Sequence, residues 1–161
     1  MIGKINLHSF NHSSILVDSF VFTPKPSFLQ FIQHGLIVNF MVAVDFTSSN
    51  GDPNDIRSLH YHNPNHYRRG IYNPYEKAIK TVSDVLVYYD TDQLFPCYGF
   101  GACLNHNPVA SSCFALNGNE VNPNVNGIDG ILQAYHNTLN RVQFSGPTLF
   151  AEVLKKANRY N

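Results

Sequence analysis

Hydrophobic positions along the chain follow two patterns, continuous apolar runs and stripes at helical spacing. The clearest run is Leu36–Val44, which is rich in β-branched residues. A short run of this kind predicts a strand that is buried on both faces, as in a parallel sheet, and it is too short to cross a bilayer as a helix. The apolar runs at 94–101 and 113–116 predict a second strand with its exit and a third, short strand.

Three later segments carry apolar residues at helical spacing and predict helices, at 74–90, at 128–141 and at 150–157. The first of them has clear start signals. Asn73 can cap the helix, Pro74 suits its first position, and Glu76 stands where a capping-box residue reaches back. Strands that alternate with such helices indicate an α/β protein in which helices flank a sheet. Asp90-Thr91-Asp92 is interpreted as the turn that ends the first helix.

Polar residues replace the first apolar run abruptly. Ligands of open α/β sheets bind outside the carboxyl ends of the strands, so the segment from Asp45 to Gly51 falls where a site is expected. Asp45, Thr47 and Ser49 stand two residues apart, and alternate side chains of an extended segment share one face. One carboxylate and two hydroxyls suit Mg²⁺, Mn²⁺ or Ca²⁺ rather than a thiolate-binding metal. A simple turn closed by Asn50-Gly51 fits the same residues, and the spacing alone does not decide between the two.

The loop from 52 to 70 is polar and contains His60, His62 and His66. The His-x-His-x-x-x-His spacing suggests zinc. No cysteine or acidic ligand accompanies these histidines, so a solvated loop rich in Asn, Pro and His is the preferred interpretation.

Eleven Lys and Arg residues balance eleven Asp and Glu residues, so net charge gives no reason to expect nucleic acid or an anionic membrane surface as a partner. The three cysteines, Cys97, Cys103 and Cys113, are an odd number without zinc-type pairing. They are interpreted as reduced, partly buried thiols of an intracellular protein. The N-terminal residues have no apolar core long enough for a signal peptide. A cytosolic location is therefore expected.

The segment Val42–Gly51 resembles the start of the von Willebrand factor A-like domain of the copine family, where Asp-x-Thr-x-Ser forms the first part of a metal-ion-dependent adhesion site. The resemblance implies a partial doubly wound sheet, Rossmann-like and of the von Willebrand factor A type, with flanking helices. It also implies that Thr148, in Gly-Pro-Thr, is the ligand from the second loop of the site. The implied metal ligands are thus Asp45, Thr47, Ser49 and Thr148. Further blocks that match the family follow in order between about residues 27 and 157: Ser58–Tyr61, Asn73–Tyr75, Tyr89–Asp92, Phe95-Pro96, Gly99–Ala102, Leu116-Asn117, Gly127–Gly130, Ala134-Tyr135 and Gly146–Phe150.

The resemblance also predicts the domain organisation. Residues 1–26 are expected to be a remnant of a preceding β-sandwich domain and a linker, with strand-like runs at 5–10 and 14–22. Residues 27–161 are expected to be the N-terminal portion of the A-like domain. The family's next element is a buried strand that ends in Thr-Asp-Gly and supplies the third loop of the metal site. We therefore expect a truncated domain with an incomplete site, an exposed sheet edge beside Leu36–Val44 and a tendency to aggregate.

Copines are calcium-dependent phospholipid-binding proteins whose A-like domain recruits partners. The resemblance implies a metal-dependent protein-interaction module that binds Mg²⁺ or Mn²⁺, or Ca²⁺, together with a protein ligand whose acidic residue completes the coordination. Contact with membrane phospholipid is expected only through domains that these residues do not contain. The expected location is the cytoplasm, with calcium-dependent peripheral association with the plasma membrane in the parent family.

Two other classes of function fit the sequence less well. The alternative within the resemblance is the copine-like A domain of a RING-type ubiquitin ligase, which needs a downstream zinc cluster of cysteines and histidines. An enzyme that uses Asp45 as nucleophile or acid would need a second Asp two residues on, or an Asp-Thr-Gly motif, and Thr47 and Phe46 stand in those places. No Ser-His-Asp or Cys-His order stands out, so an enzyme is not expected.

Overall fold

The computed structural model describes residues 21–90, 92–104 and 107–159. The chain divides into two compact units, Met1–Leu36 and Ile37–Asn161, and each is described by itself. The predicted strand at 5–10 lies outside the described residues. So does the predicted strand at 14–22, except for Val21 and Phe22, which form no regular structure.

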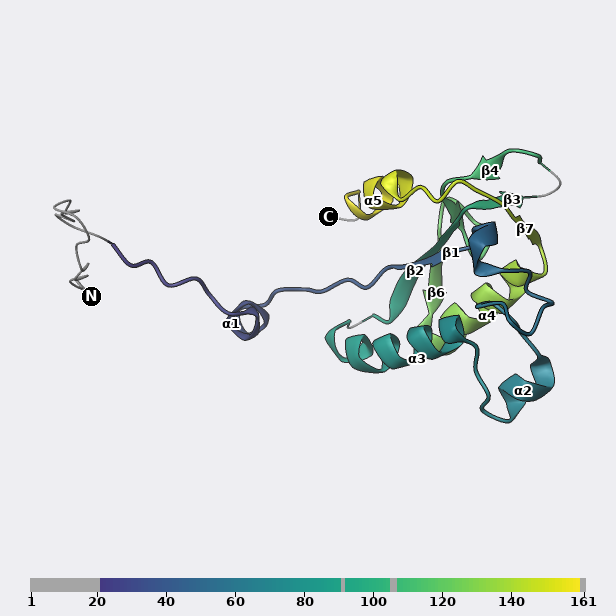
Figure 1. The fold of residues 1–161 in the computed structure, drawn as a ribbon. Coiled ribbons are helices and arrows are strands. Elements are labelled where there is room, and N and C mark those ends of the chain that lie inside the picture. Colours follow the sequence, from purple (N-terminus) through teal and green to yellow (C-terminus); the bar gives the residue numbers. More distant parts are fainter. Residues whose placement is uncertain (1–20, 91, 105–106, 160–161) are drawn as a thin grey trace, which may run out of the picture. The chain divides into compact units, whose positions relative to one another are not determined.

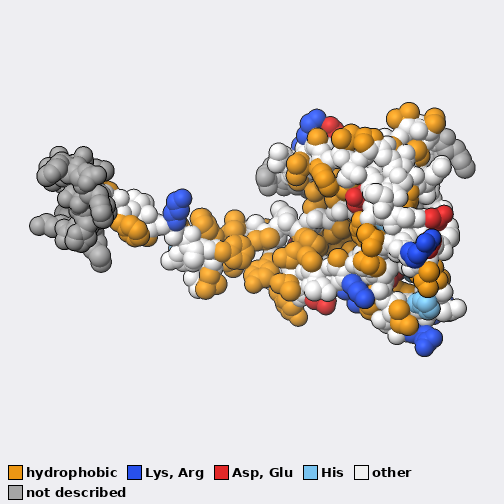
Figure 2. Space-filling view, in the orientation of Figure 1, with side chains coloured by type: hydrophobic (Ala, Val, Ile, Leu, Met, Phe, Trp, Pro, Cys, Tyr) orange, Lys and Arg blue, Asp and Glu red, His pale blue; other side chains and the backbone are white. Residues whose placement is uncertain are grey.

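The first unit contains one described helix, α1 (Phe28–Gln33). Its start is a capping box: the Gln30 amide donates to Ser27 Oγ at 3.3 Å, and the Ser27 amide donates to Gln30 Oε1 at 2.7 Å. None of its residues is buried, and Figure 2 shows hydrophobic side chains gathered on it. Its exposed large apolar residues are Phe28, Leu29 and Phe31.

The main sheet of the second unit is built around β2 (Leu94–Phe100). β1 (Val42–Asp45) runs parallel to β2, with Val42 opposite Cys97 and Asp45 opposite Phe100. On the other side of β2, two short antiparallel strands share its length: β6 (Asn124–Asn126) pairs with its first half and β5 (Phe114–Ala115) with its second half. The second and third strands predicted from the apolar runs are therefore confirmed.

A second, three-stranded antiparallel sheet continues from the end of β2. It places β3 (Ala102–Leu104) between β4 (Ala110–Ser111) and β7 (Val142–Phe144). Gly101 joins β2 to β3 with φ +76°, and a Cβ atom built there would lie 2.2 Å from Thr47 Cγ2. Only glycine satisfies both the left-handed conformation and this close approach, so Gly101 lets the two sheets meet beside Thr47.

Two long helices cover one face of the main sheet and pack against each other: α3 (Pro74–Leu86) and α4 (Gly127–Leu139) (Figure 1). The predicted capping box of α3 is confirmed, because the Glu76 amide donates to Asn73 Oδ1 at 2.8 Å and the Asn73 amide donates to Glu76 Oε2 at 2.8 Å. The buried core lies between these helices and the strands. It includes Val44, Phe46, Ile79, Phe95, Cys97, Leu116, Ile131, Leu132 and Tyr135.

The opposite face of β2 is covered by α5 (Ala151–Ala157), so the unit has helices on both sides of its sheet (Figure 1). The ring of Phe100 meets that of Phe150 just before α5, with centroids 5.1 Å apart, and Lys156 Nζ lies 5.5 Å above the Tyr98 ring. This arrangement confirms the predicted α/β class with a sheet and flanking helices. None of the described helices is long and apolar enough to cross a membrane.

The predicted strand Leu36–Val44 is wrong in its extent and in its burial. β1 begins only at Val42, and Leu36 and Ile37 are exposed. The pairing sets the start of the strand, because β1 meets β2 only from Cys97 onward. Val42 and Val44 face the α3 and α4 core, whereas Ala43 is exposed because α5 covers β2 instead. Among the described strands β1 pairs with β2 alone, so it lies at an edge of this sheet.

The predicted helices are confirmed, with shifted ends. The α-helical part of the first stops at Leu86 and continues as a 3₁₀ turn at Val87–Tyr89. The helical segment thus ends before Asp90, as predicted, and the Asp90 carboxylate accepts the amides of Phe40 and Gln93 at 3.3 Å each. Thr91, in the middle of the predicted turn, lies outside the described residues. Two short elements lie in the polar region after β1, a 3₁₀ turn at Ser48–Asn50 and α2 (Pro64–Arg68).

Candidate metal centre

The loop that follows β1 leaves the sheet at its carboxyl end. The Phe46 amide donates to the Phe100 carbonyl at 2.9 Å, which extends the pairing with β2 by one residue before the chain turns away. The Phe46 ring is fully buried in the core, while Asp45 and Ser49 reach the surface. A buried aromatic residue thus anchors the loop, while Thr47 next to it is also buried, with 2% of its surface exposed.

The structure brings the predicted loop ligands together. The Thr47 amide donates to Asp45 Oδ1 at 2.8 Å, which fixes the carboxylate over the start of the 3₁₀ turn. The hydroxyl oxygens of Thr47 and Ser49 lie 3.1 Å apart and share a hydrogen bond. The two hydroxyl groups are therefore adjacent, and the Asp45 carboxylate lies at the start of the same loop. Their role as metal ligands stays a prediction.

Asn50 holds this loop from within. Its Nδ2 donates to the Thr47 carbonyl at 3.1 Å, to Thr47 Oγ1 at 3.3 Å and to the Asp45 carbonyl at 3.4 Å. Its Oδ1 accepts the Tyr75 hydroxyl of α3 at 3.0 Å. Asn50 connects the oxygen-bearing loop to the helix layer, and the sequence pattern had marked it only as part of a turn.

His60 supports the same loop from the core. Its ring is fully buried, stacked on Tyr75 with centroids 3.9 Å apart. Its Nε2 lies 2.7 Å from the Asp45 carbonyl, which can only accept, so Nε2 carries the proton. Its Nδ1 then accepts the Tyr135 hydroxyl at 2.9 Å. Burial lowers the pKa of His60 to about 4, although the Asp45 carbonyl and carboxylate oppose the shift.

The interpretation of the loop at 52–70 as solvated is wrong for His60. The three histidines also do not form a cluster of their own, because His62 instead contacts Glu76 and His66 contacts the Tyr61 ring. A histidine in a polar segment carries no local sign that it will be buried, because its partners Tyr75 and Tyr135 lie on helices far along the chain.

The segment that carries Thr148 runs beside this loop. The Ser48 amide donates to the Ser145 carbonyl at 2.7 Å, and Thr47 forms a β-bridge with Ser145. A cis peptide bond joins Gly146 to Pro147, and Thr148 follows with an exposed side chain. The backbone of this segment therefore lies against the Asp45 loop, and the role of Thr148 as a fourth ligand stays a prediction.

The cysteines match the predicted burial in part. Cys97, Cys103 and Cys113 are free. Cys103 and Cys113 are partly buried, as predicted. Cys97 is instead fully buried in β2, and burial raises the pKa of its thiol to about 12.

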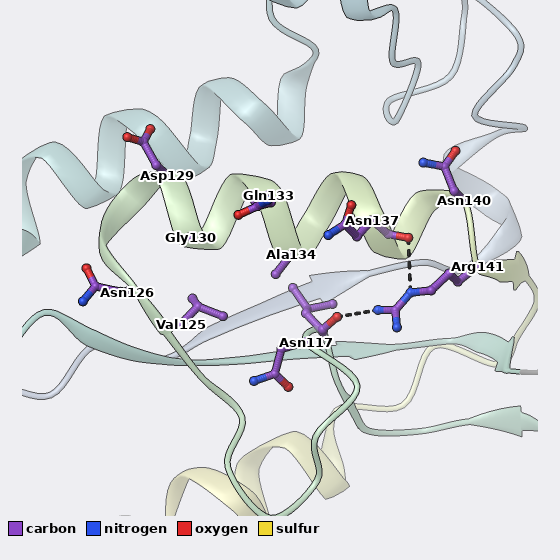
Figure 3. Close-up of a pocket in the computed structure, with 11 residues that line it drawn as sticks. Asn117, Val125, Asn126, Asp129, Gly130, Gln133, Ala134, Asn137, Asn140 and Arg141 are labelled. Atoms are coloured by element: carbon purple, nitrogen blue, oxygen red, sulfur yellow. Dashed lines mark hydrogen bonds between the residues drawn. The ribbon is translucent and has the colours of Figure 1, made fainter.

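A large cavity lies elsewhere, between α4 and the segments around Asn117 and Asn126 (Figure 3). It measures about 820 Å³, and amide side chains dominate its lining. Arg141 closes one end by donating to the carbonyls of Leu116, at 2.6 Å, and Asn137, at 3.2 Å. None of the predicted metal ligands lines it, so cavity size does not point to the Asp45 loop.

The parallel pair of β1 and β2, the antiparallel strands beyond β2 and the helices on both faces define an α/β domain of the von Willebrand factor A type. Within that class the chain belongs to the copine family, since the copine family model matches residues 58–161. Protein BONZAI 2 of Arabidopsis thaliana is 46% identical over 145 residues. Protein BONZAI 1 of the same plant is 45% identical over 145 residues.

These alignments cover 90% of this chain but only 24% of each relative, so the chain spans about a quarter of the length of the curated relatives it matches. Neither relative's name describes an enzyme. A role within the copine family follows for this chain, and finer statements about its activity are proposals.

Proposed function

We propose that this chain is a metal-dependent protein-interaction module, in which Asp45, Thr47 and Ser49 bind a divalent cation and Thr148 approaches from the neighbouring segment. The observation that carries the proposal is the grouping of the Thr47 and Ser49 hydroxyls, 3.1 Å apart, beside a carboxylate that the Thr47 amide holds at 2.8 Å. The site stands at the carboxyl end of β1, where sheets of this class bind ligands.

The chemistry of these groups fits Mg²⁺ or Mn²⁺, and also Ca²⁺. All the side-chain donors are hard oxygens, and no cysteine or histidine side chain of the described loop turns to the same point. The loop is ordered before metal binds, because Asn50 and His60 fix its carbonyl groups. When bound, the cation supplies a positive charge at the rim of the sheet, and the residues of the chain position it there.

A single carboxylate cannot balance a divalent charge. We therefore propose a protein ligand that offers an acidic side chain, and we expect metal affinity alone to be weak, with a Kd of about 1 mM. No part of the proposal requires bond-making chemistry, so we propose a binding function rather than catalysis.

The cellular location and membrane association of this module are proposed from its family alone. We propose a cytoplasmic location and calcium-dependent association with plasma-membrane phospholipid that uses domains other than this one. The balanced charge of the chain offers no electrostatic attraction of its own for an anionic surface.

The test is titration with Mn²⁺, followed by competition with Mg²⁺, on the wild-type chain and on Asp45→Ala. The variant should lose binding because only neutral hydroxyls remain. Asp52→Ala is the matched control, since Asp52 is an exposed carboxylate in the same polar segment whose Oδ1 caps only Asn54. A peptide with a single Asp should bind wild-type chain in Mg²⁺ and not in EDTA, whereas the matching Asn peptide should not bind. Equal Mn²⁺ affinity in wild type and Asp45→Ala would refute the proposal.

A further inference from the structure

Three side chains from separate elements meet at one point away from the Asp45 loop. His62 precedes α2, Glu76 stands in the first turn of α3, and His136 stands in the last turn of α4. His62 Nδ1 lies 2.8 Å and His136 Nε2 lies 2.7 Å from the same oxygen, Glu76 Oε1. One nitrogen of each ring and one carboxylate oxygen all lie within 4.8 Å of one another. We name these three residues the His₂Glu cluster.

The cluster is preorganised. Glu76 is almost fully buried, and its second oxygen accepts the Asn73 amide at the start of α3. The two imidazole rings lie against each other with centroids 4.1 Å apart, and the Tyr67 ring stands edge-on to His136 at 4.7 Å. Burial alone would raise the pKa of Glu76, but the hydrogen bonds from His136, the Asn73 amide and His62 outweigh it and lower the pKa.

Without metal, His62 Nδ1 and His136 Nε2 donate to Glu76 Oε1. A bound ion would take the place of these two protons, and each ring would then carry its proton on the other nitrogen and direct a lone pair at the ion. Two imidazole nitrogens and a carboxylate oxygen are ligands that zinc accepts, and three protein ligands leave a fourth position open. We propose that the His₂Glu cluster is a binding site for zinc, or for a divalent transition metal of the same ligand preference. The site is independent of the Mg²⁺ site proposed at Asp45.

The two histidine–glutamate distances require only a small adjustment. Zinc bonds of about 2.0–2.1 Å at a tetrahedral angle put neighbouring ligand atoms about 3.3 Å apart. The present contacts of 2.7 and 2.8 Å need to open by about 0.5 Å. The side chains of His62 and His136 remain 20% and 18% exposed, so an ion can reach them from the surface.

A fourth ligand can reach the cluster from the exposed side of its two histidines. Water or a small anionic or neutral donor can complete the coordination there. The cluster differs in kind from the His-x-His-x-x-x-His spacing, of which it uses only His62.

The test is titration of the whole chain with Zn²⁺ in excess Mg²⁺, followed by the visible absorption of bound Co²⁺. Wild type should bind one equivalent at this site, and His136→Gln should weaken binding more than about 100-fold. Glu76→Gln should weaken it as well, while Gln can still accept the Asn73 amide, so that the helix start is kept. Circular dichroism on each variant verifies that the fold is intact.

Two controls separate this site from others. His66→Gln should bind as wild type, because His66 is a nearby histidine outside the cluster. Asp45→Ala should also bind Zn²⁺ as wild type does. The proposal for the Asp45 site and the proposal for this site can therefore be refuted separately. Absence of Zn²⁺ binding by wild type, or an equal loss in His66→Gln and His136→Gln, would overturn the proposal.

Discussion

Two groups of polar side chains on the same folded unit differ in how the chain assembles them. The Asp45 loop collects its oxygens from positions two residues apart, and the hydrogen bonds from the Thr47 amide to Asp45 and between Thr47 and Ser49 are local. The His₂Glu cluster collects its ligands from a loop and two helices, with Glu76 and His136 60 residues apart. The members of the first group are neighbours in the chain, whereas the second group exists only when α3 and α4 are packed.

A chain of hydrogen bonds runs between the two groups. His60 binds the Asp45 carbonyl and receives the Tyr135 hydroxyl, and Tyr135 in turn accepts Asn73 Nδ2 at 3.3 Å. Asn73 forms the capping box with Glu76. Loop geometry on one side and the helix start on the other therefore depend on one buried network, although the two groups differ in the metals they suit.

The largest effect on stability is expected at Gly101, where the Asp45 loop meets the second sheet. Gly101→Ala places a methyl group against Thr47 at a left-handed backbone position, and we expect a loss of about 3 kcal/mol in the free energy of unfolding. Gly70→Ala is the matched control, because Gly70 has the same φ of +76° with no atom within 4 Å, and it should cost about 1 kcal/mol. Urea denaturation of both variants measures the difference. Equal losses would show that the contact with Thr47 carries no stability.

An intermediate effect is expected in the buried network. Tyr135→Phe leaves His60 Nδ1 without its donor and Asn73 Nδ2 without this acceptor, so we expect a loss of about 2 kcal/mol. Tyr75→Phe removes a hydrogen bond to Asn50 at a part-exposed position and should cost about 1 kcal/mol. Thermal unfolding of the two variants compares them. If Tyr135→Phe left the free energy of unfolding unchanged, the two groups would not be connected through this network.

The smallest effect on stability is expected at Ser49, an exposed residue of the Asp45 loop. Ser49→Ala changes an exposed side chain and should alter the free energy of unfolding by less than about 0.5 kcal/mol. It should nevertheless weaken Mn²⁺ binding about tenfold, since a ligand is lost, a change of about 1.4 kcal/mol. Ser48→Ala, at the exposed neighbour outside the two-residue spacing, should leave Mn²⁺ affinity unchanged. Calorimetric titration measures the Mn²⁺ affinity of both variants. An equal loss of affinity in Ser48→Ala and Ser49→Ala would contradict the role of Ser49 as a ligand.

The same contrast explains what the sequence could predict. The grouping of the Thr47 and Ser49 hydroxyls, the Asn73 capping box and the apolar stripe of α4 follow from local patterns, and each is present in the structure. The apolar stripe of α3 is buried only in part, because Val82 and Val85 are exposed. Burial of His60 and convergence of His62 with His136 depend on contacts between distant segments, which no local pattern records. The strand at Leu36–Val44 was predicted too long for the same reason, because its partner strand determines where pairing begins.

Amide NMR spectra recorded through a Mg²⁺ titration and then a Zn²⁺ titration test most directly whether the two groups are separate sites for different metals. We predict that Mg²⁺ shifts the resonances of Asp45 through Asn50 and leaves those of His62, Glu76 and His136 in place. One equivalent of Zn²⁺ should do the reverse. Shifts of the same set of residues by both ions, or of neither set by either ion, would contradict the assignment of an oxygen site at the Asp45 loop and a nitrogen-rich site between the helices.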